Sequence, residues 1–533
     1  MLSLPPRLRL ALGFLGSLAI TAGSLGAGWL PSAMRLAARP EIIALRDTRG
    51  AVAACALLVV GGVLVLLFCW LSLGLSLGLP RRLSRRAADQ GSASPGTGDL
   101  RQVVASLVAW SLPLLVAVPL FSRDIYAYIG QGRLMDAGLD PYANVMADVP
   151  GWAEAGVDVK WSTTVTPYGP LFVMLQRAIV GLTASAPLEF TLVLTRLLSV
   201  AGLALLIYSA WRIAQLRGFD QAAVLWAVGV SPLVLMNFVV AGHNDSLMLG
   251  LVVAGAYQGL KGRPVLATVL VTAAIGVKPI ALVALPVIGL IWAGADAGWG
   301  RVIARWAAVA GIAAGGMLAL GAGLGVGLGW VAGLGTPLGI GSWYSVPRFT
   351  SLWLRDLVNA LGGDGEAWRS GVVLVFLVAG CLLAVVLYTV KRRSDPLWLL
   401  AGGFAAVALF SPLLHPWYGL WLLCLFAVAG LRRAWQLRVL IYGTVFLMVI
   451  GTGEGLDLVP RLVLDPLILI PSRGTAIVGA VVLVAVFEFT LWRRFTARGL
   501  PMPMLAGPPL PPRRPRRSGV AWGGVSASST PSP

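Results

Sequence analysis

Long apolar runs separated by short polar segments recur along almost the whole chain. Runs approaching or exceeding the length of a membrane-crossing helix, about 20 residues, lie near 9–30, 51–79, 102–120, 222–241, 306–330, 371–390, 397–412, 417–430, 439–451 and 474–492. More ambiguous apolar stretches lie at 166–184, 188–211, 246–260 and 264–294. The pattern predicts an all-α, polytopic integral membrane protein with about 12–14 transmembrane helices.

The composition agrees with a membrane protein and excludes two other classes. Of the 533 residues, 58% are hydrophobic and only 12% are charged, whereas a soluble chain would carry about one quarter charged residues. Disordered segments are poor in apolar residues, so disorder is excluded for most of the chain. The net charge of +19 would suggest nucleic-acid binding on a soluble protein. Here the basic residues form short clusters between apolar runs, as in cytoplasmic loops, and we expect no nucleic-acid partner.

These basic clusters set the expected topology. They are Arg81, Arg82, Arg85 and Arg86; Lys391, Arg392 and Arg393; Arg432, Arg433 and Arg438; and Arg493 and Arg494. With the clusters and the N-terminus inside, the loops 121–165, 331–370 and 452–473 fall outside. We therefore divide the chain into an N-terminal two-helix segment (1–101), a membrane module (102–330), C-terminal helices (331–492) and a basic, Pro-rich cytoplasmic tail (493–533).

Two of the ambiguous stretches need special treatment to satisfy this topology. The stretch 264–294 must cross twice and turn at Lys278-Pro279, because proline lacks a donor and disfavours helix in the residue before it. One segment between the first outer loop and His243 must also fail to cross fully. The stretch 166–184, which contains Gln176 and Arg177, is the better candidate, but the sequence leaves this open.

Polar residues that could carry chemistry gather on the predicted outer side, beginning with Asp124. This carboxylate opens the first outer loop, beside Arg123 and followed by Tyr126, Tyr128 and Gln131. A carboxylate there could act as a general base on a hydroxyl within hydrogen-bond reach. The alternative is a structural role at the membrane interface, in a salt bridge of Asp124 with Arg123 or with a belt of Tyr residues.

The remaining candidates lie at other predicted outer helix ends. Ionisable residues at membrane depth are costly and usually face a cavity or a substrate path. Together with Arg123, Tyr126, Tyr128 and Gln131 beside Asp124, the candidates for substrate binding are Tyr168, His243, Asn244, Asp245, Lys278, Arg348, His415, Trp417 and Tyr418. Lys278 needs a counter-charge, which a lipid-linked phosphate or Asp245 would supply. No helical i, i+4 pair joins the histidines and aspartates, so we expect no metal ligands.

The motifs resemble those of the GT-C glycosyltransferases, in particular the actinobacterial polyprenyl-phosphate-mannose-dependent α-1,6-mannosyltransferases of lipomannan and lipoarabinomannan biosynthesis. The resemblance covers roughly 100 to 492 and rests on the acidic residue that opens the loop and on DPY (140–142), YGP (168–170), GHND (242–245) and HPWY (415–418). It implies a GT-C fold with a long catalytic first outer loop, in the plasma membrane, with the active site facing outside.

The resemblance also implies the chemistry. Asp124 would be the base, polyprenyl-phosphate mannose the donor and a lipid-anchored mannan the acceptor, within the membrane lipids. GT-C members often have a second acid in the loop, and Asp136, Asp140 and Asp148 are all available. A requirement for a divalent cation stays open, and no other cofactor is expected. The competing hypothesis is a transporter or flippase for a polyprenyl-phosphate-linked sugar, which would predict an inverted repeat that the sequence does not display.

Overall fold

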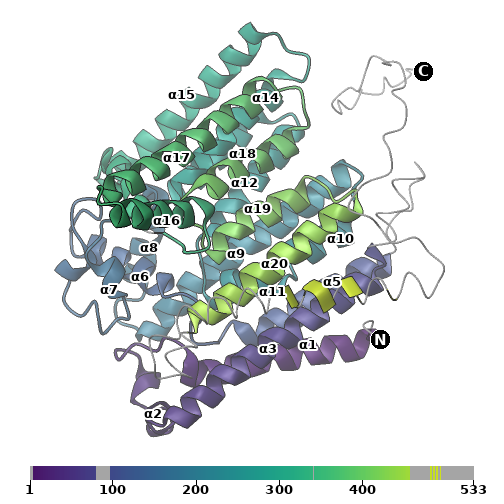
Figure 1. Ribbon diagram of the computed structural model, residues 1–533. Coiled ribbons are helices and arrows are strands. Elements are labelled where there is room, and N and C mark those ends of the chain that lie inside the picture. The colour runs from purple at the N-terminus through teal and green to yellow at the C-terminus, as the bar shows by residue number, and fades with distance from the viewer. Residues whose placement is uncertain are drawn as a thin grey trace, which may run out of the picture.

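The computed structural model describes residues 4–79, 97–339 and 341–456, together with residues 481, 482, 484–486, 488, 489 and 493. Within these residues the chain forms helices and no strands, which confirms the all-α class (Figure 1). The basic cluster at 81–86, most of the loop 452–473 and of the segment 474–492, and nearly all of the tail 493–533 lie outside the described residues. The predicted division into four parts stays a prediction.

The helices follow one another with short connections. The first are α1 (Pro6–Ala27), η1 (Arg35–Ala38), α2 (Pro40–Asp47), α3 (Arg49–Ser76), α5 (Thr97–Leu114), α6 (Asp124–Asp136), η2 (Met146–Asp148), α7 (Val159–Ser162), α8 (Pro170–Leu182), α9 (Leu188–Leu216), α10 (Gln221–Val228), α11 (Pro232–Val234) and η3 (Leu235–Val240). The others are α12 (Asp245–Leu260), α13 (Pro264–Val277), η4 (Pro279–Ala284), α14 (Leu285–Ala293), α15 (Trp299–Leu324), η5 (Gly329–Gly339), α16 (Val346–Ala360), α17 (Gly365–Thr389), α18 (Pro396–Phe410), α19 (Pro416–Val428) and α20 (Ala434–Gly455).

Several of these helices are long and apolar enough to cross a membrane. Among the described residues six qualify, namely α1, α3, α9, α15, α17 and α20, and a seventh if the bent pair α10 with α11 and η3 counts as one span. Five shorter apolar elements of 10–17 residues accompany them: Pro170–Leu182, Pro264–Val277, Pro279–Ala293, Pro396–Phe410 and Pro416–Val428. The protein is therefore polytopic. Three of the short elements lie in the stretches 166–184 and 264–294 that the sequence left ambiguous, and the other two lie in the runs 397–412 and 417–430.

Proline accounts for the start of each short helix. All five begin with proline at the first helical position, where the missing N–H is not needed. The break in the stretch 264–294 lies at Lys278-Pro279, as the sequence predicts, with α13 ending at Val277 and η4 beginning at Pro279. The helix in the stretch 166–184, α8, has 13 residues and is only about 20 Å long, which is short for a full crossing.

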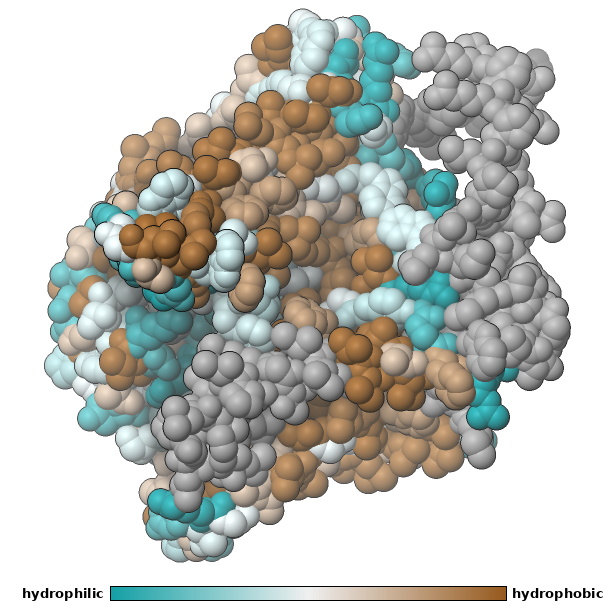
Figure 2. All heavy atoms as spheres, in the orientation of Figure 1, coloured by the Kyte–Doolittle hydropathy of each residue, from teal (hydrophilic) through white to brown (hydrophobic). Residues whose placement is uncertain are grey.

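Hydrophobic side chains cover the flanks of the bundle, and hydrophilic ones gather at its ends. Figure 2 shows brown, apolar side chains over α15 and α17, and teal side chains at the end of the bundle where Figure 1 places α6 and α7. The window of α17 that could span a membrane is only 6% buried. Such an apolar flank is expected for a surface in contact with lipid.

Close contact between α9 and α12 positions the polar segment that precedes α12. Gly202 of α9 and Gly250 of α12 face each other so tightly that a Cβ added to Gly202 would lie 2.4 Å from Leu247 Cα. Small residues at such a crossing let two backbones approach. The crossing brings Ser199 of α9 to the residues just before α12, where the hydroxyl of Ser199 donates to the carbonyl oxygen of His243 at 2.8 Å.

Candidate active site

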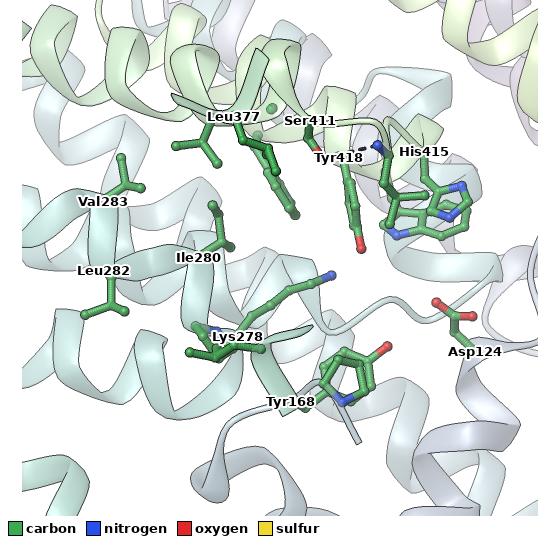
Figure 3. Close-up of a pocket in the computed structure, with 18 of the residues that line it drawn as sticks. Asp124, Tyr168, Lys278, Ile280, Leu282, Val283, Leu377, Ser411, His415 and Tyr418 are labelled. Carbon is green, nitrogen blue, oxygen red and sulfur yellow. Dashed lines mark hydrogen bonds between the residues drawn. The ribbon is translucent and has the colours of Figure 1, made fainter. Parts of the chain in front are cut away.

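A cavity of about 380 Å³ opens between the end of α6 that begins at Asp124 and the helices η4, α17, α18 and α19. Polar and aromatic side chains line one part of it: Asp124, Trp161, Tyr168, Lys278, Ser411, His415, Trp417, Tyr418 and Trp421. Apolar side chains line the rest: Pro167, Pro279, Ile280, Leu282, Val283, Leu334, Leu377, Val407, Ala408 and Leu413. Figure 3 shows Asp124 and His415 on one side, Leu282, Val283 and Leu377 on the other, and Lys278 reaching between them.

Asp124 is held in place by a strained turn and two hydrogen bonds. Phe121, three residues earlier, has φ 70°, the only positive φ of a non-glycine residue among those that the structure describes. That conformation costs about 1 kcal/mol or more. The Asp124 backbone N–H donates to Ser122 Oγ at 3.1 Å, and the Trp161 indole donates to Asp124 Oδ1 at 3.2 Å. Asp124 Oδ2 lies 3.6 Å from His243 Nδ1.

The surroundings make Asp124 a stronger base than an ordinary aspartate. Burial raises its pKa to about 6, an effect that the positive charge of Lys278 reduces and the negative charge of Asp245 increases. The hydrogen bonds from Ser122 and Trp161 also hold the pKa down. At neutral pH Asp124 is therefore mostly ionised, yet its pKa is high enough for it to take a proton effectively.

A tight turn brings His243, Asn244 and Asp245 to the inner wall behind the cavity. Gly242 supplies the turn with φ 69°, a conformation that glycine adopts without strain. The His243 carbonyl accepts hydrogen bonds from the hydroxyls of Ser199 and Ser246, at 2.8 and 3.1 Å. Tyr128 of α6 lies against the same segment, with its hydroxyl 3.4 Å from His243 Nδ1.

Lys278 finds a counter-charge in Asp245, one of the two partners that the sequence left open. Lys278 Nζ lies 2.8 Å from Asp245 Oδ1, and the Trp421 indole donates to the same oxygen at 2.7 Å. The ammonium also lies over the ring of Tyr418, 4.5 Å from its centroid. Because both charges are buried, each depends on the other for compensation.

Trp417 stacks between the two histidines of the chain. Its ring centroid lies 4.0 Å from that of His243 and 4.3 Å from that of His415. Burial and the nearby lysines lower the pKa of His415 to about 3, and burial together with Lys278 lowers the pKa of His243 well below its usual range. Both imidazoles are therefore neutral at physiological pH and can donate or accept hydrogen bonds without a charge.

Three buried polar atoms of the His243–Asp245 segment have no hydrogen-bond partner among the described residues. They are His243 Nε2, Asn244 Nδ2 and Asp245 Oδ2. A buried polar atom without a partner costs about 1–3 kcal/mol, so such atoms are usually satisfied by a ligand or by water. None of the three residues lines the cavity, so these atoms mark a buried polar segment directly behind it.

The structure separates the predicted site residues into two groups. Six line the cavity, namely Asp124, Tyr168, Lys278, His415, Trp417 and Tyr418. Tyr128, His243 and Asp245 contact members of that group directly, and Asn244 contacts Tyr128. Arg123, Tyr126, Gln131 and Arg348 are not among the lining residues.

The outlying residues have other surroundings. Arg123 pairs with Asp158 at 3.1 Å, so the salt bridge with Asp124 that the sequence offered as an alternative is not formed. Tyr126 donates its hydroxyl to the Trp29 carbonyl at 2.5 Å. Gln131 is buried within α6 with Oε1 unpaired among the described residues. Their assignment to substrate binding stays a prediction.

Sequence reasoning missed Trp161 and Trp421, the two indoles that donate to the site's carboxylates. Trp161 lies in the first outer loop and Trp421 one turn after the HPWY motif. The position of Trp161 in a polar loop was the only feature of the sequence that could have indicated its place in the site. None of the three loop acids proposed as a second acid lines the cavity. Asp140 and Asp148 instead accept hydrogen bonds from the loop backbone, at Tyr142 and Val145.

The described part of the chain contains no group of three or more histidine, cysteine, aspartate or glutamate residues arranged to hold a metal ion. We therefore assign no metal ligands, and the question of a divalent cation stays open.

Comparison with known proteins gives two family matches. A family model described as Alpha-(1->6)-mannopyranosyltransferase, N-terminal domain, matches residues 10–294, and a model described as MptB C-terminal domain matches residues 367–471. The first range includes Asp124, His243 and Lys278, and the second includes His415. No solved structure matches the chain.

Individual relatives carry the same description. Alpha-(1->6)-mannopyranosyltransferase A of Mycobacterium tuberculosis is 37% identical over 53% of this chain and 51% of its own length. The protein of that name from Corynebacterium glutamicum is 35% identical over 44% of this chain and 45% of its own length. A probable alpha-(1->6)-mannopyranosyltransferase of Mycolicibacterium smegmatis is 28% identical over 77% of this chain and 76% of its own length. The chain thus spans about half the length of the first two relatives.

Proposed function

Because the chain belongs to the α-(1→6)-mannopyranosyltransferase family, we propose that it transfers mannose from polyprenyl-phosphate mannose to a lipid-anchored α-1,6-linked mannan. The reaction takes place in the cavity beside Asp124, on the outer face of the plasma membrane. The product belongs to the lipomannan and lipoarabinomannan class. The relatives' names support mannose as the sugar and α-1,6 as the linkage. The lining of the cavity supports a lipid-linked donor.

The observation that carries the proposal is a single cavity that joins a buried, basic carboxylate to an apolar wall. The wall is formed by η4, α17 and α18, and its residue Leu282 is 44% exposed on the flank of the bundle. A sugar on a polyprenyl phosphate needs both environments, since its chain stays in lipid while its sugar and phosphate reach a polar site. A nucleotide-sugar donor has no lipid chain that would contact the apolar wall.

The transfer step follows from the arrangement. The acceptor hydroxyl oxygen attacks C1 of the mannose, and Asp124 Oδ2, the oxygen that Trp161 does not hold, takes the hydroxyl proton. The bond between C1 and the phosphate oxygen breaks, and its electron pair leaves with the polyprenyl phosphate. Attack from the face opposite the phosphate converts a β-linked donor into an α-linked product.

The other side chains position and stabilise the reactants. Lys278 lies between Asp124 and the apolar wall (Figure 3), where its charge can attract the phosphate while Asp245 holds the ammonium in place. His415, neutral at working pH, can donate a hydrogen bond to the phosphate or the sugar. Orientation of this kind supplies much of the rate, because the donor phosphate is already a good leaving group.

Transfer by purified protein in liposomes tests the proposal. The reaction contains radiolabelled polyprenyl-phosphate mannose and a short α-1,6-mannoside, and compares the wild type with Asp124→Asn. We expect transfer by the wild type and a loss of about 10²-fold or more in the variant, with donor binding retained. Asp136→Asn is the matched control, because Asp136 lies exposed at the other end of α6.

Each other outcome has a definite meaning. Equal transfer by Asp124→Asn and wild type would remove Asp124 as the base and direct attention to Asp245. No transfer by the wild type, together with movement of the labelled lipid between leaflets, would overturn the proposal in favour of the flippase. Transfer of glucose or arabinose in place of mannose would correct the donor sugar and leave the mechanism intact.

A further inference from the structure

The helix α16 (Val346–Ala360) carries a stripe of exposed apolar side chains. The stripe consists of Val346, Phe349, Trp353 and Leu357, of which Phe349 is 65% and Trp353 is 61% exposed. At 100° per residue these four positions fall within about 80° of the helix circumference. Large apolar side chains gathered so narrowly on a surface helix indicate a contact with something apolar.

The rest of the helix has two other faces. Pro347 and Ser351 are buried against the bundle, about a quarter to a third of a turn from the stripe. Arg348 and Arg355 lie on the side roughly opposite the stripe, again at 100° per residue. A helix on the surface of a membrane protein that carries an apolar stripe on one side and arginines on the other has the arrangement of an interfacial amphipathic helix.

The helix that follows α16 in the chain indicates that lipid covers the stripe. After a short turn the chain enters α17 at Gly365, the span with the least buried window in the described chain. Leu374 and Val375 of α17 are 61% and 68% exposed, as expected for residues in contact with lipid. Figure 2 shows that the apolar surface at α16 continues onto α17.

The charges of the arginines on and near the side of α16 opposite the stripe also indicate a lipid contact. Arg355 and Arg369 pair with Asp356 and Glu366. Arg348, by contrast, forms no salt bridge with a described residue, and Glu366 acts on it only through the longer-range attraction of its charge. A long side chain of this type extends to the level of the lipid phosphates while its helix stays at the edge of the acyl chains.

We propose that α16 lies in the bilayer interface on the cavity's side of the membrane, with the Val346–Leu357 stripe against the acyl chains and Arg348 at the phospholipid phosphates. The partner is the phospholipid of that leaflet.

The interfacial helix is tied to the cavity by hydrogen bonds. Just before α16, the Ser345 hydroxyl donates to the Ser411 carbonyl at 2.7 Å, and the Leu414 N–H donates to Ser342 Oγ at 3.1 Å. Ser411 lies in the cavity wall, and Leu414 precedes His415. These bonds couple the position of α16 to that of the loop that carries His415.

Spin-label accessibility in liposomes of phosphatidylethanolamine and phosphatidylglycerol tests the proposal. A nitroxide is attached at Trp353→Cys or at Phe349→Cys in the stripe, and at Arg355→Cys on the opposite face as the matched control. Cys381, which is exposed on α17, and the partly exposed Cys55 are first replaced by serine. Collisions with oxygen, which concentrates in lipid, are compared with collisions with a water-soluble nickel chelate.

We expect the ratio of oxygen to nickel collisions to be several-fold higher at the two stripe positions than at Arg355→Cys. Arg348→Gln should lower that ratio at the stripe by loosening the helix from the interface. Equal ratios on both faces would overturn the proposal, with equally low values placing α16 in water and equally high values placing it within the acyl chains. Stripe labels shielded from both reagents would overturn it too, by indicating a protein cover such as a second copy of the chain. Two stripe positions are used so that misfolding of one variant leaves the test intact.

Discussion

Lowering the pH from 7 to 5 should slow mannosyl transfer about tenfold, because Asp124 must be ionised to take the acceptor's proton. Between pH 7 and pH 5 the two histidines of the site keep the same charge. The pKa of His243 is lowered well below its usual range and that of His415 to about 3. Neither histidine therefore changes charge between pH 5 and 8, and the acid limb of the profile reports on the carboxylate.

The magnitude follows from the pKa of Asp124, which burial raises from 3.8 to about 6. A carboxyl with a pKa of 6 is about 90% ionised at pH 7 and about 9% ionised at pH 5. With its ordinary pKa of 3.8 it would still be more than about 90% ionised at pH 5, and the rate would hardly change. The two cases differ by about tenfold at pH 5, which a transfer assay resolves.

The assay measures kcat/KM for transfer from radiolabelled donor in liposomes between pH 5 and 8, for the wild type and Trp161→Phe. The substitution removes the indole hydrogen bond that favours the ionised carboxylate. The midpoint should rise by up to about one pH unit, since a hydrogen bond to a charged group is worth about 1.5 kcal/mol or more. Asp136→Asn should leave the midpoint unchanged.

A rate that stays constant down to pH 5 would contradict this prediction, since either Asp124 would not be the base or its burial would not raise its pKa. An acid limb that persists unchanged in Trp161→Phe would show that the titrating group is not the carboxylate that this indole holds.

Three further predictions concern stability, each read from thermal unfolding in detergent. Lys278→Met should destabilise the fold by about 3–5 kcal/mol, because it strands the buried charge of Asp245; the double variant with Asp245→Asn should recover most of the loss, and an additive loss would contradict the pairing. Asp124→Asn should stabilise the fold at pH 7 by up to about 3 kcal/mol, the free energy of a shift of about two pKa units. Since this carboxyl binds its proton more tightly when folded, the gain should shrink as the pH falls from 6 toward 4, and a gain independent of pH would count against it. Gly169→Ala should destabilise by about 1–3 kcal/mol, because its Cβ would lie 2.5 Å from the backbone of α13, whereas Gly181→Ala, with open space around it, should not.

The positions of the predicted polar motifs in the sequence indicated only part of the site. Gly242 and the residues after it, and the HPWY motif, end up in one place, as the clustering on one predicted side suggested. However, the partners of the carboxylates were out of reach, because the hydrogen bond between Trp421 and Asp245 joins residues 176 positions apart. The same holds for Trp161, whose loop position gave no indication that its indole would reach Asp124.

Patterns within the sequence account for the local features of the fold. The long apolar runs dictate helices in lipid, because a backbone in a bilayer must satisfy its own hydrogen bonds. Proline dictates where a run breaks, as at Lys278-Pro279. Only the tertiary structure decided that Lys278 pairs with Asp245, that Arg123 pairs with Asp158, and that α16 leaves an apolar stripe uncovered. Those outcomes depend on which helix faces meet, and close packing between segments far apart in the chain sets that, not any pattern within one segment.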